Sequence, residues 1–283
     1  MRIPQSRLAL PLAALFAVCF VAPLVVLLAL SLQGGTDAQG FSLARLSFAH
    51  YRDFFADGFN DRILASTLLL GVKATVVCLL FGFPLAWICA QARSPWQSVL
   101  MFLVVLPILT SVVVRTFAWI VILGRLGIVN HTLQWLGVVD DPVNLLFTET
   151  GVVIVLAQVQ MPLMVLPIMT VLSKLDPNLL DASQALGAGP WRTLRRVILP
   201  LAAPGIVAGC ILTYAASVTA FVTQTLIGGA RLVYMPLRIY QEATGANNWP
   251  YAAAIAIVFM VAVLAVIYGA GWVGKQLGGP VHA

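Results

Sequence analysis

The chain has 283 residues, of which 61% are hydrophobic and only 9% are charged. Soluble domains carry about 25% charged residues, so this composition excludes an ordinary soluble globular protein and indicates that lipid surrounds most of the chain. We attribute the net charge of +6 to loops near lipid head groups rather than to a nucleic-acid surface. The four cysteines lie inside apolar runs without metal-ligand spacing, which favours small buried side chains over a metal site.

Six apolar runs are long enough to cross a membrane, which takes about 20 residues. They cover residues 8–32, 63–90, 97–123, 151–173, 201–227 and 251–274. Lipid offers the backbone no hydrogen-bond partners, so each run is expected to be a helix. The first run is longer than the apolar segment of a signal peptide, about 7–15 residues, and is therefore expected to remain as a span. We predict an all-α integral membrane protein of six transmembrane helices, forming a single domain over residues 1–283.

The distribution of Lys and Arg predicts the orientation. With the N-terminus inside, the inside segments 1–7, 91–96, 174–200 and 275–283 hold eight Lys and Arg in 49 residues. The outside loops 33–62, 124–150 and 228–250 hold six in 80. Cytoplasmic loops carry the excess of these residues. Both termini are therefore expected in the cytoplasm.

Lys73 and Arg115 are the ionisable residues well inside the predicted spans. Both are expected roughly 12–15 Å below the outer edge of the membrane, from a rise of 1.5 Å per residue. Such charges usually face a wet cavity or the bundle interior, although their long stems could instead carry them to the interface. No acid lies within a predicted span to pair with them, which disfavours an ion-coupled carrier and an intramembrane hydrolase.

Uncharged polar residues also interrupt the apolar runs, among them Gln158 and Gln160 in the fourth run and Ser217 in the fifth. They either line a translocation path or make ordinary hydrogen bonds between helices. The candidate residues for the path or its outer gate are Lys73, Arg115, Gln158, Thr219, Thr223 and Gln224.

The segment from Asp176 to Ile206 separates the fourth and fifth runs. It predicts a short helix over 178–186, a glycine break at Gly187 and Gly189, and a basic turn. The turn carries Arg192, Arg195 and Arg196. Leu199-Pro200 then leads into the fifth run.

Asp181-Ala182-Ser183, followed by Gly187 and then by Ile198-Leu199-Pro200, resembles the Glu-Ala-Ala loop of the permeases of binding-protein-dependent ABC importers. Segments 106–119, 145–149 and 220–229 are similar to the spermidine/putrescine class of these permeases, and the resemblance covers roughly residues 63–275. Two positions depart from the usual motif, since Asp181 stands for Glu and Ser183 for the second Ala.

The resemblance implies the permease fold of a type I ABC importer, with a coupling helix in the cytoplasmic loop 174–200 that docks on a separate ATPase. The residues implied to couple are Leu180, Asp181, Ala182, Ser183, Ala185, Leu186, Gly187 and Ala188. The implied partners are an ABC ATPase dimer, a second and different permease, a periplasmic substrate-binding protein and membrane lipid, without nucleic acid. The implied location is the bacterial inner membrane.

The chain has no Gly-x-x-x-x-Gly-Lys-Ser/Thr phosphate loop. We therefore expect a non-catalytic subunit without a cofactor of its own, with ATP bound by the partner ATPase. The implied cargo is a polyamine-like solute or a related small charged solute, such as an opine or a phosphonate. The alternative is a stand-alone secondary carrier or channel, which would transport without ATP.

Overall fold

The structure of the chain, a computed structural model, describes residues 5–34, 46–92, 95–176 and 178–277. Side chains at 5–14, 180, 181, 184, 273, 275 and 277 are outside this description. The predicted inside charges Arg2, Arg7, Arg93 and Lys275 therefore lie outside the described residues or side chains, as do the side chains of Leu180 and Asp181.

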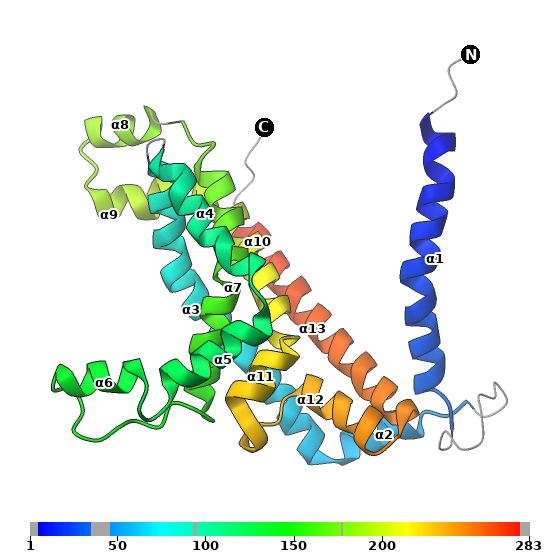
Figure 1. Ribbon diagram of the computed structural model, residues 1–283. Coiled ribbons are helices and arrows are strands. Elements are labelled where there is room, and N and C mark those ends of the chain that lie inside the picture. The colour runs from blue at the N-terminus through cyan, green and yellow to red at the C-terminus, as the bar shows by residue number, and fades with distance from the viewer. Residues whose placement is uncertain (1–4, 35–45, 93–94, 177, 278–283) are drawn as a thin grey trace. The chain divides into compact units, whose positions relative to one another are not determined.

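Every regular element of the described residues is a helix, as the sequence predicts (Figure 1). The α-helices are α1 (Gln5–Ser31), α2 (Ala49–Ala56), α3 (Gly58–Gln91), α4 (Trp96–Leu109), α5 (Val112–Leu123), α6 (Ile128–Trp135), α7 (Glu149–Leu172), α8 (Asn178–Ala185), α9 (Pro190–Thr193), α10 (Leu199–Val218), α11 (Phe221–Gly228), α12 (Met235–Tyr240) and α13 (Trp249–Leu277). Short π turns, η3 (Leu194–Ile198) and η5 (Gln241–Gly245), and a 3-10 turn, η4 (Gly229–Arg231), join some of them.

Five stretches of the described residues are long and apolar enough to cross a membrane. They are Gly58–Gln91, Val112–Trp135, Glu149–Leu172, Pro190–Val218 and Trp249–Trp272. The first predicted run lies in α1, of which Leu15–Ser31 forms a shorter apolar helix, and Trp96–Leu109 is another. The chain is thus a multi-pass helical membrane protein.

The third and fifth apolar runs are broken, where the sequence predicted single helices over 97–123 and 201–227. α4 and α5 are separated at Thr110 and Ser111, whose ψ angles are 147° and 132°. α10 and α11 are separated at Thr219 and Ala220, and Ala220 has a ψ of 63°. Hydropathy records how apolar a residue is and not its backbone conformation, so both breaks escaped the prediction.

The chain divides into two compact units, each described by itself: residues 1–64 with 235–262, and residues 65–234 with 263–283. We call them unit 1 and unit 2. The prediction of one domain over 1–283 stays a prediction.

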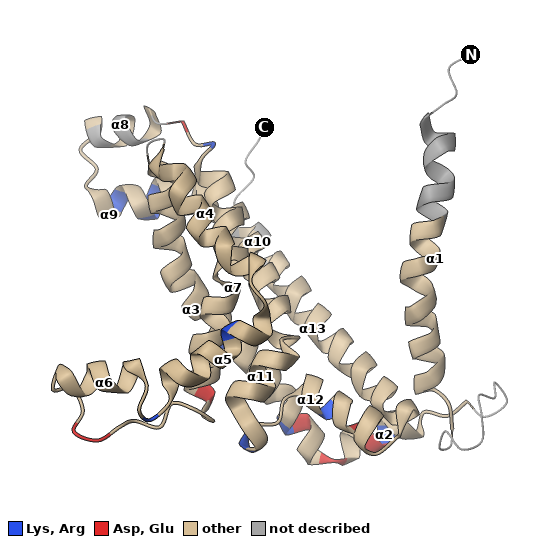
Figure 2. Cartoon of the chain, in the orientation of Figure 1, with Lys and Arg blue, Asp and Glu red and all other residues tan. Residues whose placement is uncertain are grey.

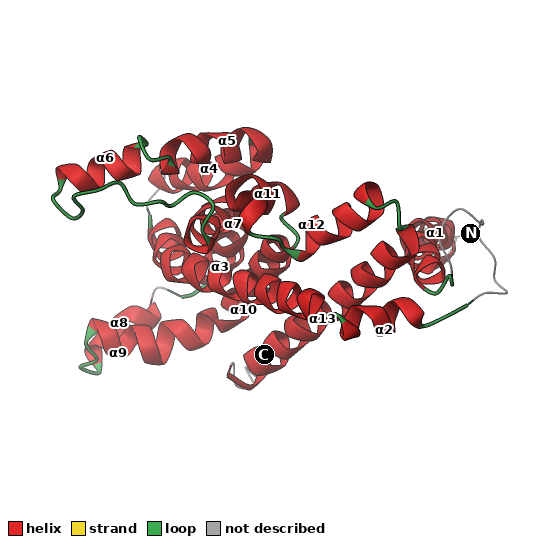
Figure 3. Cartoon of the chain, turned by 90° about the horizontal axis from the view of Figure 1, so that it is seen from below, coloured by secondary structure: helices red, strands yellow, loops and turns green. Residues whose placement is uncertain are grey.

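Helix α7 is the centre of unit 2, and α4, α5, α10 and α11 pack against it (Figure 3). Thirteen of its 24 residues are buried, including Val152, Leu156, Met164 and Ile168. The Cys78 thiol of α3 donates to the Ala157 carbonyl at 2.9 Å, so α3 also contacts α7. A helix that is apolar all round is expected in such a central place.

Small residues let α10 approach α7 closely. A Cβ atom at Gly205 would lie 2.8 Å from the Pro167 carbonyl oxygen, and one at Gly209 would lie 3.0 Å from that of Met164. The two glycines are four residues apart and therefore lie on one helix face, an arrangement that lets membrane helices pack with their backbones in near contact.

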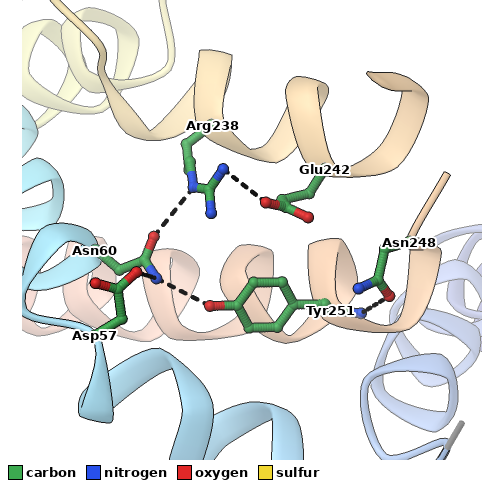
Figure 4. Close-up of polar contacts among 6 residues, drawn as sticks. All are labelled: Asp57, Asn60, Arg238, Glu242, Asn248 and Tyr251. Atoms are coloured by element: carbon green, nitrogen blue, oxygen red, sulfur yellow. Dashed lines mark hydrogen bonds and ion pairs between the residues drawn. The ribbon is translucent and has the colours of Figure 1, made fainter. Parts of the chain in front are cut away.

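Unit 1 is tied together by a buried polar cluster around Asn60, whose side chain is fully buried (Figure 4). Its amide nitrogen donates to Asp57 at 3.0 Å and to the Tyr251 hydroxyl at 2.9 Å, and its amide oxygen accepts from Arg238 at 3.1 Å. Arg238 also pairs with Glu242 at 2.6 Å. The cluster joins the start of α3 to α12, η5 and the start of α13.

Candidate coupling hairpin and membrane cavity

Helix α8 ends at Ala185, one residue before the predicted end, and the predicted glycine break follows at Gly187. Gly187 has a φ of +75°, in the left-handed region that glycine adopts without strain. The Ala188 amide donates to the Ser183 carbonyl at 3.1 Å, and the Leu186 amide to the Ala182 carbonyl at 3.1 Å. This pattern satisfies carbonyl groups that the end of a helix leaves open.

The two short helices α8 and α9 are joined by a side-chain hydrogen bond. The hydroxyls of Ser183 and Thr193 lie 2.8 Å apart and both residues are buried. Of the predicted coupling residues, Ser183 therefore faces the hairpin interior, whereas Ala182, Ala185 and Leu186 are exposed, Leu186 at 88%. We call residues 178–193 the coupling hairpin.

The predicted basic turn is helical, which corrects the sequence analysis. Arg192 lies in α9, and Arg195 and Arg196 lie in the π turn η3, so the helix runs from Pro190 to Val218. Pro200 has no backbone N–H and its ring would clash with the carbonyl four residues earlier in a regular helix. The π turn just before Pro200 changes this geometry, and the Leu199 amide bonds to Leu194 instead.

The coupling hairpin lies at one end of the unit 2 bundle, and α6 lies at the other end (Figure 1). Within this unit, Lys and Arg occur on α9 and also on α5, which lies between the two ends (Figure 2). The basic residue of α5 is one of the predicted path residues, Arg115.

A cavity of about 460 Å³ lies among α4, α5, α7, α10 and α11. It brings together three predicted path residues, Arg115, Thr219 and Thr223. Gln160 also lines it, and donates to the Ala216 carbonyl at 3.2 Å. Sequence reasoning left Gln160 out of the candidate set, although its polarity inside an apolar run was the available signal. The remaining lining residues are Ile108, Val112, Val159, Pro162, Leu163, Ala216, Ala220, Phe221 and Val222.

Three other predicted path residues are not part of this cavity. Gln158 accepts a hydrogen bond from the Trp119 indole at 3.0 Å, which joins α7 to α5. Gln224 is buried and donates to the carbonyls of Ser217 and Val218 at 2.8 and 3.1 Å, where α10 ends. Both side chains make hydrogen bonds between helices, the alternative that the sequence left open. Lys73, the third of these residues, pairs with an acid.

Lys73 has an acidic partner, although no acid lies within a predicted span. Its ammonium group donates to Glu149 at 2.7 Å, and the two side chains are 43% and 44% exposed. Glu149 falls just before the predicted fourth span, but α7 already begins there. Burial, followed by the charge of Glu149, raises the pKa of nearby Tyr234 to about 12.

A double-mutant cycle of Lys73→Met and Glu149→Gln should give a coupling of about 1 kcal/mol, typical of a partly exposed ion pair. We expect Glu149→Gln to be the more destabilising single change. It leaves Lys73 unpaired, whereas Lys73→Met leaves Glu149 at the N-terminus of α7, where the helix dipole favours a negative charge. Thermal unfolding of the four purified proteins measures this. Additive effects of the two changes would contradict the ion pair.

The arrangement of these parts is that of a membrane permease: a multi-pass helical bundle with a largely apolar cavity that also contains Arg115 and Gln160, and a helical hairpin at one end. Residues 82–277 match the family described as "Binding-protein-dependent transport system inner membrane component". The chain belongs to this family, and it is accordingly a non-catalytic inner-membrane permease subunit of a binding-protein-dependent ABC importer.

Two proteins with similar sequences are also named as transport system permeases. The spermidine/putrescine transport system permease protein PotB of Haemophilus influenzae is 34% identical over 82% of this chain and 81% of its own length. PhnU of Salmonella choleraesuis, named for 2-aminoethylphosphonate transport, is 29% identical over 91% of this chain and 88% of its own.

A solved structure shares the fold. A chain of the bacterial alginate ABC transporter, in complex with an alginate pentasaccharide-bound periplasmic protein, matches with a TM-score of 0.75 at 19% identity. The match covers 97% of this chain and 95% of that chain. Family membership sets aside the stand-alone carrier or channel that the sequence left open.

Proposed function

We propose that this permease forms the path of a small charged solute through the membrane and is driven by a separate ATPase that docks on the coupling hairpin. The observation that carries the proposal is the hairpin itself. A hydrogen bond between the Ser183 and Thr193 hydroxyls joins its two helices, and Gly187 follows the end of the first helix. Leu186 and Trp191 are 88% and 72% exposed. An exposed apolar projection is suited to insertion into a groove of a partner.

The proposed docking residues are those implied by the sequence, namely Leu180, Asp181, Ala182, Ser183, Ala185, Leu186, Gly187 and Ala188. We assign contact with the ATPase to the exposed Ala182, Ala185 and Leu186, together with Asp181. Ser183 acts through the hydrogen bond to Thr193, which holds α8 against α9.

The proposed topology has six spans, with α1 as the first, and places both termini and the loop 174–200 in the cytoplasm. The excess of Lys and Arg in the inside segments supports this orientation. α4 and α5 together make the third span, and α10 and α11 the fifth, each with its break inside the membrane. Membrane proteins tolerate such irregular backbone where it is buried or lines a cavity.

The proposed assembly contains an ABC ATPase dimer, a second and different permease, and a periplasmic substrate-binding protein. ATP binds to the ATPase, and this chain binds no cofactor. The alginate transporter chain with the same fold was solved together with a periplasmic protein, which supports the periplasmic member of this set.

The proposed cargo is a polyamine-like solute or a related small charged solute, such as an opine or a phosphonate. PotB, at 34% identity, is named for spermidine and putrescine, and PhnU, at 29%, is named for 2-aminoethylphosphonate. The two names span a cationic and a zwitterionic solute, so the relatives alone do not separate these classes.

Purification of the tagged chain from native membranes in mild detergent tests the proposal. We expect an ATPase and a second multi-pass protein to co-purify with it. Asp181→Lys should lose the ATPase and keep the second permease, because the reversed charge lies on α8 alone. Asp140→Lys makes the same charge change at an exposed loop position beyond α6 and should keep both partners. A chain that purifies alone and moves solute without ATP would falsify the proposed function.

A further inference from the structure

The cavity among the broken helices carries an unbalanced positive charge. Arg115 is the one charged residue among the described residues that line it, and Asp and Glu do not occur among them. Two guanidinium nitrogens of Arg115, Nε and Nη1, are buried and have no hydrogen-bond partner within the described part of the chain. A buried donor on a charged group is strongly destabilised when it has no acceptor. An anionic ligand would supply the missing acceptor.

The break before α11 brings the positive end of a helix to the same cavity. Ala220 is the N-cap of α11, and Ala220, Phe221, Val222 and Thr223 all line the cavity. The amides of Ala220 and Phe221 already donate to the carbonyls of Ser217 and Thr219, but the helix dipole still makes this end positive. The start of α11 therefore faces the cavity with the electrostatics that favours an anion.

The break before α5 brings the positive end of a second helix to the cavity. Its N-cap, Ser111, makes no side-chain capping bond, and Val112 at the first helical position lines the cavity. Arg115 lies in the first turn of this helix. The hydroxyls of Thr116 and Thr223 lie 3.4 Å apart, so α5 and α11 pack directly against each other near their starts.

We propose that this cavity is a binding site for an anionic group, a carboxylate or a phosphonate, of a zwitterionic or anionic cargo. Arg115 supplies the formal charge, the dipoles of α5 and α11 add positive potential, and Gln160 and Thr219 are neutral polar residues of the lining. The volume of 460 Å³ is within the range of about 300–1,000 Å³ typical of small-molecule sites.

This inference rests on the proposed function and narrows its cargo. A purely cationic solute such as putrescine would meet Arg115 without a lining acid to offset the repulsion. A solute that carries both an amine and an acid, as 2-aminoethylphosphonate does, would pair its acid with Arg115. Discontinuous membrane helices whose N-termini point at anionic substrate groups are a known construction in transporters.

A charge-sensitive labelling experiment tests the site in the intact importer in detergent. Thr219→Cys places a thiol in the cavity, and peptide-resolved mass spectrometry measures its modification by an anionic and a cationic methanethiosulfonate reagent. Thr132→Cys on α6 is the matched control. Both threonines are exposed and both donate to the carbonyl four residues earlier at 2.8 Å, but Thr132 is outside the cavity.

We expect the ratio of anionic to cationic modification to be higher at Thr219→Cys than at Thr132→Cys. Adding Arg115→Gln should lower the ratio at Thr219→Cys by about tenfold, as expected for losing one nearby charge in a medium of intermediate polarity. Arg115→Lys should retain most of the preference of Thr219→Cys for the anionic reagent. The proposal is overturned if Thr219→Cys reacts faster with the cationic reagent. It is also overturned if Arg115→Gln leaves the ratio at Thr219→Cys unchanged. The comparison of the two sites is decisive even where Arg115→Gln fails to fold.

Protection by the ligand class completes the test. We expect 10 mM 2-aminoethylphosphonate to slow the reaction of Thr219→Cys with neutral N-ethylmaleimide severalfold, and 10 mM putrescine to leave it unchanged. Protection by putrescine alone, or by neither probe, overturns the anion site. Because the labelling needs neither ATP hydrolysis nor uptake, such a failure is distinct from failure of the proposed function, which is read from co-purification of the ATPase.

Discussion

Gly205→Leu is expected to lower the midpoint of thermal unfolding of the purified chain by about 2–12 °C. At this position the Cβ atom would lie 2.8 Å from a backbone oxygen of α7 and 3.0 Å from the Ile168 Cα, so α10 must move away from the central helix. Overpacking costs about 1–3 kcal/mol, and 1 kcal/mol shifts the midpoint by about 2–4 °C in a chain of this size. Size-exclusion chromatography after heating measures the effect.

Ala208→Leu is the matched control, because Ala208 is exposed on the same helix and gains the same kind of bulk without facing α7. We expect its unfolding midpoint to stay within about 2 °C of the parent, as is usual for a surface substitution. Equal losses from the two changes would mean that added bulk anywhere on α10 is harmful, and that the close α7–α10 contact is not the cause.

Arg115→Ala is expected to reduce ATP-driven uptake by about 10- to 100-fold while leaving assembly with the ATPase intact. The expected size follows from the contribution of hydrogen bonds to charged groups, about 1.5–3 kcal/mol, and a tenfold effect corresponds to about 1.4 kcal/mol. The structural reason is that Arg115 is the charged lining residue of the cavity. Uptake into proteoliposomes containing the complete importer, with ATP supplied to the ATPase, gives the measurement.

Arg125→Ala removes an exposed arginine that is outside the cavity, just after α5, and serves as the control. It should transport at nearly the parental rate. Normal uptake by Arg115→Ala would remove Arg115 from the path, and joint loss of uptake and of ATPase binding would make its role one of folding rather than transport.

The helical membrane class and the glycine stop of α8 were readable from the sequence because local chemistry specifies them. Long uncharged runs must be helical in lipid, whatever packs around them. Gly187 stops α8 because its left-handed conformation is a property of glycine itself. The family was equally accessible, since Asp181, Gly187 and Pro200 stand at fixed spacings within one short loop.

The breaks and the pairings depended on neighbours far away in the chain. Thr110, Ser111 and Thr219 are polar residues within the runs 97–123 and 201–227, but uncharged polar residues also occur inside unbroken helices such as α7, so polarity does not mark the points where these helices end. At Thr219, a glutamine in the next helix, Gln224, takes up the carbonyls that the break leaves open. The same packing places α5 against α11 and so creates the cavity.

The sequence by itself therefore determined that lipid surrounds most of the chain, that the chain is helical and that it belongs to the permease family. It also determined which residue types are available for a path. Which of those residues share a site was decided by tertiary structure. It paired Lys73 with Glu149, 76 residues away, joined Asn60 to Tyr251, 191 residues away, and bonded Gln158 to Trp119, 39 residues away. The physical reason is that burial and hydrogen bonding in a helical bundle depend on which faces meet, and a one-dimensional pattern of polarity does not contain that information.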